Sequence, residues 1–169
     1  LCTNLVNEGI EVEVIAAAED RIASTVDEVD GVKVHRLDHQ FEISSTPITL
    51  GLPSLLSKMA GDFDLLHLNF PNPWSDFLYL TLGRNHKAVL TYHSDIFRPA
   101  NTLSGKLLKA YKPFTHKLLA SVAAIIASSP NIIEHSPFLS RQQERCRVIP
   151  MPVDMAAFSE PTPEIAQEA

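Results

Sequence analysis

The sequence predicts an α/β fold, a doubly wound and mostly parallel sheet with helices on both faces. Short apolar segments typical of buried strands alternate along the chain with segments of helical spacing, and this alternation predicts a parallel sheet covered by helices. The run Ala88–Tyr92 is the strongest single observation, because it is apolar, β-branched and aromatic and stops at His93, Ser94 and Asp95. A buried parallel strand has this pattern when it brings polar groups to the end of a sheet.

The three polar residues after this run are the first candidates for a functional site. Ligands of open α/β sheets bind outside the carboxyl ends of the strands, where His93, Ser94 and Asp95 are expected to lie. We interpret them as groups for chemistry or recognition. The alternative is a strand-end histidine that only caps a neighbouring loop, and spacing alone leaves both readings open.

In the first half of the chain, strands are predicted at residues 10–17, 32–37 and 65–70. A helix that ends at Gly9 precedes them, and a helix at residues 52–59 is expected to end at Gly61. The acidic segment 19–31 is expected to be loop with at most a short helix, and the polar segment 38–47 is expected to be loop. After a stiff proline-containing turn, Ser75 is expected to N-cap a helix that ends at Gly83.

In the second half, helices are predicted at residues 103–112 and 114–121, because Pro113 is expected to divide what would otherwise be one helix. A strand at 123–127 follows, then a helix capped by Ser129 with Pro130 at its first position, then a strand at 147–150. Residues 1–155 are predicted to form one domain. The Pro- and Glu-rich residues 156–169 are predicted to be a linker.

Length and composition exclude several classes of protein. The 169 residues are 45% hydrophobic, enough for one domain with a full core. The net charge of −6 argues against nucleic acid as a partner. Two cysteines without metal-type spacing favour a reduced, cytoplasmic setting. The longest apolar run, residues 118–127, is about half of the roughly 20 residues that a membrane span requires.

Charge is unevenly distributed along this acidic chain. Residues 96–133 contain no acidic side chain, and the basic residues of this window are Arg98, Lys106, Lys109, Lys112 and Lys117. The ordinary interpretation is a solvated helix face. The functional interpretation is a surface that binds phosphates or an anionic membrane, which would place the protein at the inner face of the membrane.

Four segments occur in an order and spacing that resembles a known family. They are residues 64–71 (DLLHLNFP), 91–96 (TYHSDI), 124–130 (AIIASSP) and 148–154 (VIPMPVD) with Phe158 after them. Together they resemble the N-terminal, acceptor-side domain of GT-B glycosyltransferases, and the closest match is the retaining family 4 or "group 1" type. The resemblance extends from about Leu5 to Phe158.

The resemblance implies a Rossmann-like fold, here one of two such domains that face each other across a cleft. It implies that a nucleotide-sugar donor is held mainly by the second domain and that a sugar is transferred with retention of configuration, without a metal. A histidine at the position of His93 would contact the donor sugar near the reacting centre. Asp95 would hydrogen-bond that histidine or an acceptor hydroxyl.

Further candidates for donor or acceptor binding lie near the ends of neighbouring strands. Asn69, Trp74 and Asp76 are expected to line an acceptor pocket, with Trp74 stacked on a sugar, although packing in a turn explains Trp74 equally well. Ser129 and Arg98 are added as candidate anion-binding residues, and helix capping is the alternative for Ser129. His67 reads as a satisfied core histidine. The remaining histidines form no ligand pattern, so no metal site is predicted.

Two features of the family are not found in this sequence. They are the first strand with its glycine-rich turn, and the donor-binding domain with its carboxylate pair. In a doubly wound sheet the first strand is central, and its loss would leave backbone groups unpaired on both neighbours. We therefore expect that the strand lies outside this sequence, that another chain supplies one by strand exchange or dimerisation, or that the strands rearrange to close the gap.

These observations predict part of a glycosyltransferase of surface polysaccharide biosynthesis, acting on a glycan or lipid-linked saccharide acceptor. This portion alone is predicted to be inactive. The alternative is a non-catalytic, Rossmann-like module that binds a sugar or a protein partner. An unrelated Rossmann-like enzyme, such as a sugar epimerase, would need its own nucleotide-binding signature, and the sequence contains no GxGxxG or P-loop motif.

Overall fold

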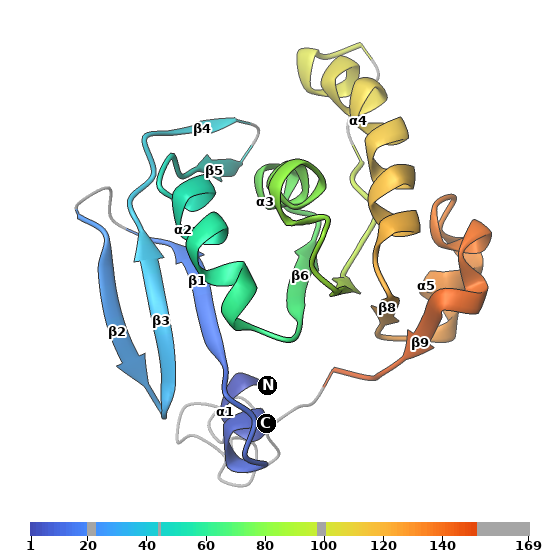
Figure 1. The fold of residues 1–169 in the computed structure, drawn as a ribbon. Helices are drawn as coiled ribbons and strands as arrows, with labels where there is room; N and C mark the ends of the chain where they lie inside the picture. The colour runs from blue at the N-terminus through green and yellow to red at the C-terminus, as the bar shows by residue number, and fades with distance from the viewer. Residues whose placement is uncertain (20–22, 44, 98–100, 152–169) are drawn as a thin grey trace, which may run out of the picture.

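A computed structural model describes residues 1–19, 23–43, 45–97 and 101–151 (Figure 1). The helices are α1 (Cys2–Asn7), α2 (Leu52–Met59), α3 (Pro73–Leu78), α4 (Leu103–Ser121) and α5 (Pro130–His135). The strands are β1 (Glu13–Ala17), β2 (Thr25–Val29), β3 (Val32–Leu37), β4 (Phe41–Ile43), β5 (Thr46–Ile48), β6 (Leu66–Phe70), β7 (Ala88–Tyr92), β8 (Ala124–Ala127) and β9 (Cys146–Val148). A π-helical turn at Tyr79–Gly83 extends α3.

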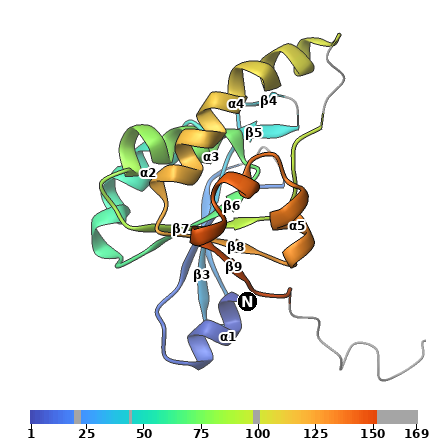
Figure 2. The ribbon, with the colours of Figure 1, turned by 90° about the vertical axis from the view of Figure 1, so that its right-hand side faces the viewer.

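The centre of the fold is a four-stranded parallel sheet in the order β6-β7-β8-β9. Its register pairs Phe70 with Tyr92 and Tyr92 with Ala127, so three strands end at the same edge. Helices α3 and α4 lie over one face of this sheet (Figure 2). The chain therefore has the predicted α/β, Rossmann-like architecture.

A second sheet, in the order β1-β3-β2, is formed by the amino-terminal part of the chain. β1 and β3 are parallel, whereas β2 and β3 form an antiparallel hairpin. The Glu13 carboxylate of β1 contacts Lys33 at 2.8 Å and His35 at 2.6 Å, which ties β1 to β3 through side chains as well as backbone. Strands β4 and β5 form a separate antiparallel hairpin.

In the portion of the chain that the structure describes, no strand joins the two larger sheets. β1 is the outer strand of one sheet and β6 is the outer strand of the other, and neither pairs with the other. The expectation that the strands rearrange to close the gap is therefore wrong. Among the described strands, β1 pairs with β3 alone and β6 pairs with β7 alone, so neither sheet extends toward the other. The two other expectations, a strand outside this sequence and a strand from another chain, stay predictions.

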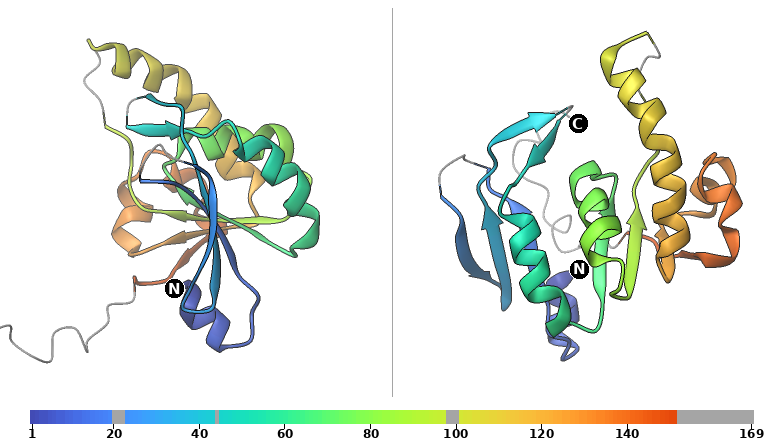
Figure 3. Two further views of the ribbon diagram at one scale, coloured as in Figure 1. Left: turned by 90° about the vertical axis from the view of Figure 1, so that its left-hand side faces the viewer. Right: turned by 45° about the horizontal axis from the view of Figure 1, so that its top comes forward.

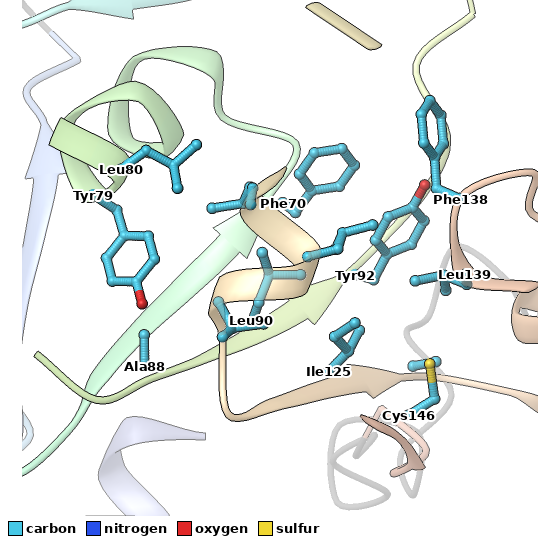
Figure 4. Close-up of a cluster of buried hydrophobic side chains, with 14 residues drawn as sticks. Phe70, Tyr79, Leu80, Ala88, Leu90, Tyr92, Ile125, Phe138, Leu139 and Cys146 are labelled. Atoms are coloured by element: carbon cyan, nitrogen blue, oxygen red, sulfur yellow. The ribbon is translucent and has the colours of Figure 1, made fainter. Parts of the chain in front are cut away.

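The main core lies between the four-stranded sheet and the helices on its face (Figure 4). Side chains alternate along β7, so Ala88, Leu90 and Tyr92 are buried while Val89 and Thr91 lie on the other face. Leu90 has 0% of its surface exposed, and Tyr92 stacks on Phe70 with ring centroids 4.7 Å apart. Apolar burial of this kind is the main force that stabilises the domain.

The acidic segment was predicted to be loop, and this prediction is wrong. Residues 25–29 form β2, which turns back into β3 through Asp30 and Gly31, with φ of 51° and 76°. An Asp-Gly pair is a strong hairpin signal because both residues tolerate positive φ. The sequence did not indicate a strand here because all five residues of β2 are exposed, so they show no alternation of apolar and polar side chains.

The segment at 38–47 was also expected to be loop, and it contains the β4–β5 hairpin. Its strands are only three residues long, too short for a periodic pattern to appear in the sequence. The N-cap of α3 is Asn72 rather than Ser75, since the Asn72 side chain accepts a hydrogen bond of 3.2 Å from the Ser75 backbone N–H.

Pro113 does not divide α4, contrary to the prediction. The helix runs through it from Leu103 to Ser121 (Figure 3). Proline removes one helical hydrogen bond, but contacts on both sides of it hold the helix against α3. Tyr111 hydrogen-bonds Asp76, and Phe114 stacks on Phe77. No helix among the described residues is long and apolar enough to cross a bilayer.

Replacing Leu90 by Ala is expected to lower the free energy of unfolding by about 2–5 kcal/mol, because it leaves a cavity in a fully buried site. Urea denaturation followed by circular dichroism measures this change. Leu65→Ala is the matched control: this leucine is 43% exposed, and its loss is expected to cost less than about 1 kcal/mol. Equal losses for the two variants would contradict the assigned core.

Candidate functional site

The polar residues that follow the strands meet at one edge of the four-stranded sheet. Asn69 lies near the carboxyl end of β6, His93 follows β7 directly, and Ser128 and Ser129 follow β8. Parallel pairing places these ends together because the three strands run in the same direction. The structure thus brings together a subset of the residues predicted from the sequence.

His93 is exposed, and its imidazole is held by Asn69. Nε2 of His93 lies 3.1 Å from Oδ1 of Asn69, and the backbone N–H of His93 donates to the carbonyl oxygen of Phe70 at 3.0 Å. The backbone bond continues the β6–β7 ladder one residue beyond β7. The backbone of His93 is therefore fixed by β6, and its imidazole is exposed at the edge of the sheet.

Asp95 is bound to residues other than His93. Its Oδ1 accepts hydrogen bonds from the Tyr92 hydroxyl at 2.6 Å and from the Ser136 hydroxyl at 2.9 Å. Ser136 is 2% exposed, and its oxygen also accepts from the backbone N–H groups of Phe138 and Leu139 at 3.3 Å. Asp95 thus ties the end of β7 to the turn after α5, which fixes the backbone next to His93.

Burial and the neighbouring carboxylate of Asp95 raise the pKa of the Tyr92 hydroxyl, so Tyr92 stays a hydrogen-bond donor at neutral pH. Sequence reasoning missed Ser136 as a member of this network. The available signal was the Ser136-Pro137 pair, because a serine hydroxyl at a turn often accepts hydrogen bonds from backbone N–H groups a few residues further on, as it does here from Phe138 and Leu139.

The other predicted site residues have different surroundings. Ser94 is exposed beside His93. Ser129 occupies the N-cap position of α5, as predicted, but its side chain makes no capping hydrogen bond. Arg98 lies outside the described residues.

Trp74 and Asp76 both lie on α3, and their contacts hold α3 in place. The Trp74 indole N–H donates to the backbone oxygen of Thr49 at 3.0 Å, and its ring stacks on Phe77. The Asp76 carboxylate accepts from the Tyr111 hydroxyl of α4 and from the Asn72 backbone N–H at 3.3 Å. These bonds connect α3 with α4 and with the residue that follows β5, rather than with His93.

The Asp76 carboxyl group is fully buried. Its Oδ1 has no hydrogen-bond partner among the described residues, and burial raises its pKa to about 7, although the bonds from Tyr111 and Asn72 oppose this shift. With this pKa the Asp76 carboxyl group is mostly neutral in mildly acidic solution and about half ionised near pH 7. The contacts of Asp76 with Tyr111 and Asn72 connect α3 with α4, which is a structural role.

His67 lies on the same sheet face as Asn69, and like His93 it forms a hydrogen bond across β6 and β7 through its Nε2. Its Nε2 is 2.7 Å from Oγ1 of Thr91, one diagonal cross-strand step before the Asn69–His93 pair. The prediction of a core histidine is wrong because His67 lies on the exposed face, although its ring nitrogen is satisfied. The pKa of His67 is lowered by partial desolvation and, to a smaller degree, by the charge of His93.

Two of the hollows on the described surface are large enough to note, and neither is lined by His93. One, about 470 Å³ in volume, lies beside β1 and includes Ile10 and Glu13. The other, about 280 Å³, is an apolar groove between α3 and α4 lined by Pro73, Phe77, Ala110, Tyr111 and Phe114. The described residues contain no group of three or more His, Cys, Asp or Glu side chains that could hold a metal ion.

Comparison with known proteins decides the family. The profile of Glycosyltransferase Family 4 matches residues 1–157. The chain belongs to Glycosyltransferase Family 4.

Two curated proteins are similar to this family 4 chain. It is 34% identical over 145 residues to the O-antigen chain mannosyltransferase C of Escherichia coli, a match that covers 84% of the chain and 37% of that protein. It is 32% identical over 161 residues to the D-rhamnosyltransferase WbpZ of Pseudomonas aeruginosa, which covers 95% and 41%. The chain thus spans about two fifths of the length of these relatives.

Replacing Asp76 by Asn is expected to change how stability depends on pH. Because the folded pKa of about 7 exceeds the ordinary value of 3.8, Asp76 contributes a cost that appears as pH rises from about 4 to about 7. Over this range the wild type is expected to lose about 1–4 kcal/mol of unfolding free energy relative to Asp76→Asn. Urea denaturation at several pH values measures the difference.

The matched control for this experiment is Asp64→Asn, at an exposed carboxylate just before β6. This variant is expected to keep the pH dependence of the wild type. Parallel stability curves for the wild type and Asp76→Asn would contradict the assignment of a neutral, buried carboxyl group to Asp76.

Proposed function

We propose that this chain is the acceptor-side domain of a retaining glycosyltransferase. The enzyme transfers a sugar from a nucleotide-sugar donor to a glycan or lipid-linked saccharide in surface polysaccharide biosynthesis. Membership of family 4 supports the reaction class, and the names of the two relatives, an O-antigen mannosyltransferase and a rhamnosyltransferase, support the kind of product. The observation that carries the proposal is the exposed His93 imidazole, fixed by Asn69 at the carboxyl end of β7.

Glycosyl transfer develops positive charge on the sugar and negative charge on the leaving diphosphate. Groups that are already oriented toward these charges lower the barrier, because they need no reorganisation during the reaction. A histidine near neutrality exchanges a proton with a hydroxyl at small cost. We assign His93 to this contact, with Ser94 beside it, and assign to Asp95 the role of holding the backbone through Tyr92 and Ser136.

In this proposal the donor nucleotide is bound mainly by a second domain, and no metal takes part. The chain alone is accordingly expected to lack transferase activity and to bind nucleotide sugars weakly. The alternative is a module that binds a sugar or a protein without catalysis. Tight binding of a nucleotide sugar by these 169 residues, measured by calorimetry, would contradict the division between two domains.

The basic residues of α4 support contact with an anionic membrane or a lipid diphosphate at the cytoplasmic face. Lys106, Lys109, Lys112 and Lys117 are all exposed. The amino-terminal half of α4 projects beyond the rest of the described chain (Figures 1 and 3). The groove between α3 and α4 lies along the same helix, and Phe77 at its side is 45% exposed. Exposed lysines next to exposed aromatic surface are typical of proteins that lie on a membrane.

Replacing His93 by Ala in the complete polypeptide is expected to lower kcat at least about 100-fold, as the loss of a general acid or base does. The exposed side chain contributes little to stability, so the unfolding free energy is expected to change by less than about 1 kcal/mol. Transfer of labelled sugar and urea denaturation measure the two effects. His86→Ala, two residues before the same strand, is the control that is expected to keep near-normal turnover. Near-normal turnover of His93→Ala would remove His93 from the site.

Reversing the charge of Lys106, Lys109 and Lys112 to Glu is expected to weaken binding to anionic vesicles by at least about tenfold, since each basic residue near the surface contributes about 1 kcal/mol. Co-sedimentation with phosphatidylglycerol vesicles measures the binding. The matched control replaces Lys58, Arg84 and Lys87 by Glu. These three residues are exposed elsewhere on the chain, so the total charge changes by the same amount. Equal binding by the two variants would remove the membrane proposal.

A further inference from the structure

Two diagonal cross-strand hydrogen bonds, each made by Nε2 of a histidine, lie next to each other along β6 and β7. His67 of β6 contacts Thr91 of β7, and His93 after β7 contacts Asn69 of β6. In each pair the two partners are offset by two residues from direct register, because Asn69 lies opposite Thr91. The two pairs differ in one chemical respect: Thr91 presents a hydroxyl, whereas Asn69 presents a carbonyl oxygen.

This difference determines which tautomer of the imidazole each partner can accommodate. A hydroxyl can donate or accept, so Thr91 is compatible with either tautomer of His67. A carbonyl oxygen can only accept, so the 3.1 Å contact between Nε2 of His93 and Oδ1 of Asn69 requires a proton on Nε2. In a neutral imidazole the other nitrogen, Nδ1, is then unprotonated.

We propose that Asn69 is a positioning residue that holds His93 in the tautomer protonated at Nε2, so that Nδ1 is the nitrogen that accepts a hydrogen bond from a substrate hydroxyl. This inference rests on the proposed function. It assigns Asn69 a part in orienting His93, in addition to any contact of its amide N–H groups with substrate. It also states which atom of His93 meets the acceptor or donor sugar.

A neutral amide suits this role better than a carboxylate. When Nδ1 takes up a proton, the bond from Nε2–H to Asn69 persists, so the ring keeps its orientation in both protonation states. A carboxylate at position 69 would stabilise the imidazolium and hold Nδ1 protonated near pH 7. The nearby carboxylate of Asp95 is engaged with Tyr92 and Ser136. The other titratable neighbour is His67, whose pKa is lowered by desolvation and by the charge of His93.

The test follows the ring nitrogens of His93 directly by NMR of the complete polypeptide with ¹⁵N-labelled histidine, assigned with His93→Gln. In the wild type at a pH where the ring is neutral, Nε2 is expected to be protonated and Nδ1 unprotonated in nearly all molecules. Asn69→Ala is expected to give a mixture of tautomers. Asn69→Asp is expected to raise the pKa of His93 by about one unit or more.

Thr91→Val is the matched control, since it removes the partner of His67 and leaves Asn69 in place. It is expected to alter the His67 nitrogens and leave the His93 tautomer unchanged. In kinetics, Asn69→Asp is expected to move the acidic limb of the kcat/KM profile to higher pH by the same amount as the pKa. A wild-type ring protonated at Nδ1, or a His93 pKa that Asn69→Asp leaves unchanged, would overturn the inference.

The outcome is separable from that of the proposed function. The NMR measurement reports the Asn69–His93 pair whether or not the protein transfers a sugar. If His93→Ala keeps its activity while the tautomer behaves as expected, the assignment of His93 to catalysis fails and the pairing stands. If His93→Ala is inactive and the tautomer is insensitive to Asn69, the positioning role fails alone.

Discussion

The alternation of side chains along β7 is the constraint that arranges both the core and the candidate site. Ala88, Leu90 and Tyr92 must point into the core because their burial stabilises the sheet against α3 and α4. The period of two then places Thr91 on the opposite face and leaves His93 exposed just beyond the strand. A shift of register by one residue would exchange the two sets, so the same packing that stabilises the domain also fixes the position of the imidazole.

Much of the fold could be predicted from the sequence because its main strands carry strong patterns. β3, β7 and α2 occupy the predicted residues, since their apolar periods are unbroken. The β2–β3 hairpin was missed because β2 is acidic and fully exposed, although Asp30-Gly31 indicated a turn. Pro113 was expected to end a helix, and only the contacts of Tyr111 and Phe114 with α3 explain why it does not. Such contacts join residues far apart in the chain, so local sequence cannot reveal them.

The candidate site was predictable in part for the same reason. His93 follows an unmistakable buried strand, and its exposure follows from the strand period. Its pairing with Asn69 depends on the register between β6 and β7, which the sequence does not specify. The contact of Asp95 with Ser136 joins residues 41 positions apart. Family membership supports the reaction class. In our proposal each residue has a separate part: His93 makes the contact, Asn69 orients His93, and Asp95 holds the backbone beside it.

The unpaired edges of β1 and β6 have a practical consequence for anyone handling these 169 residues by themselves. Each edge presents a row of backbone donors and acceptors that no described strand occupies, and such rows are templates onto which extended peptide can add. Both edges also carry apolar side chains that are only partly buried, Val14 and Ile15 on β1 and Leu66 and Leu68 on β6. Partly exposed apolar strands of this kind are prone to pair with other chains. Concentrated samples of the isolated chain are therefore expected to aggregate through β-strand addition, and dilution disfavours this association.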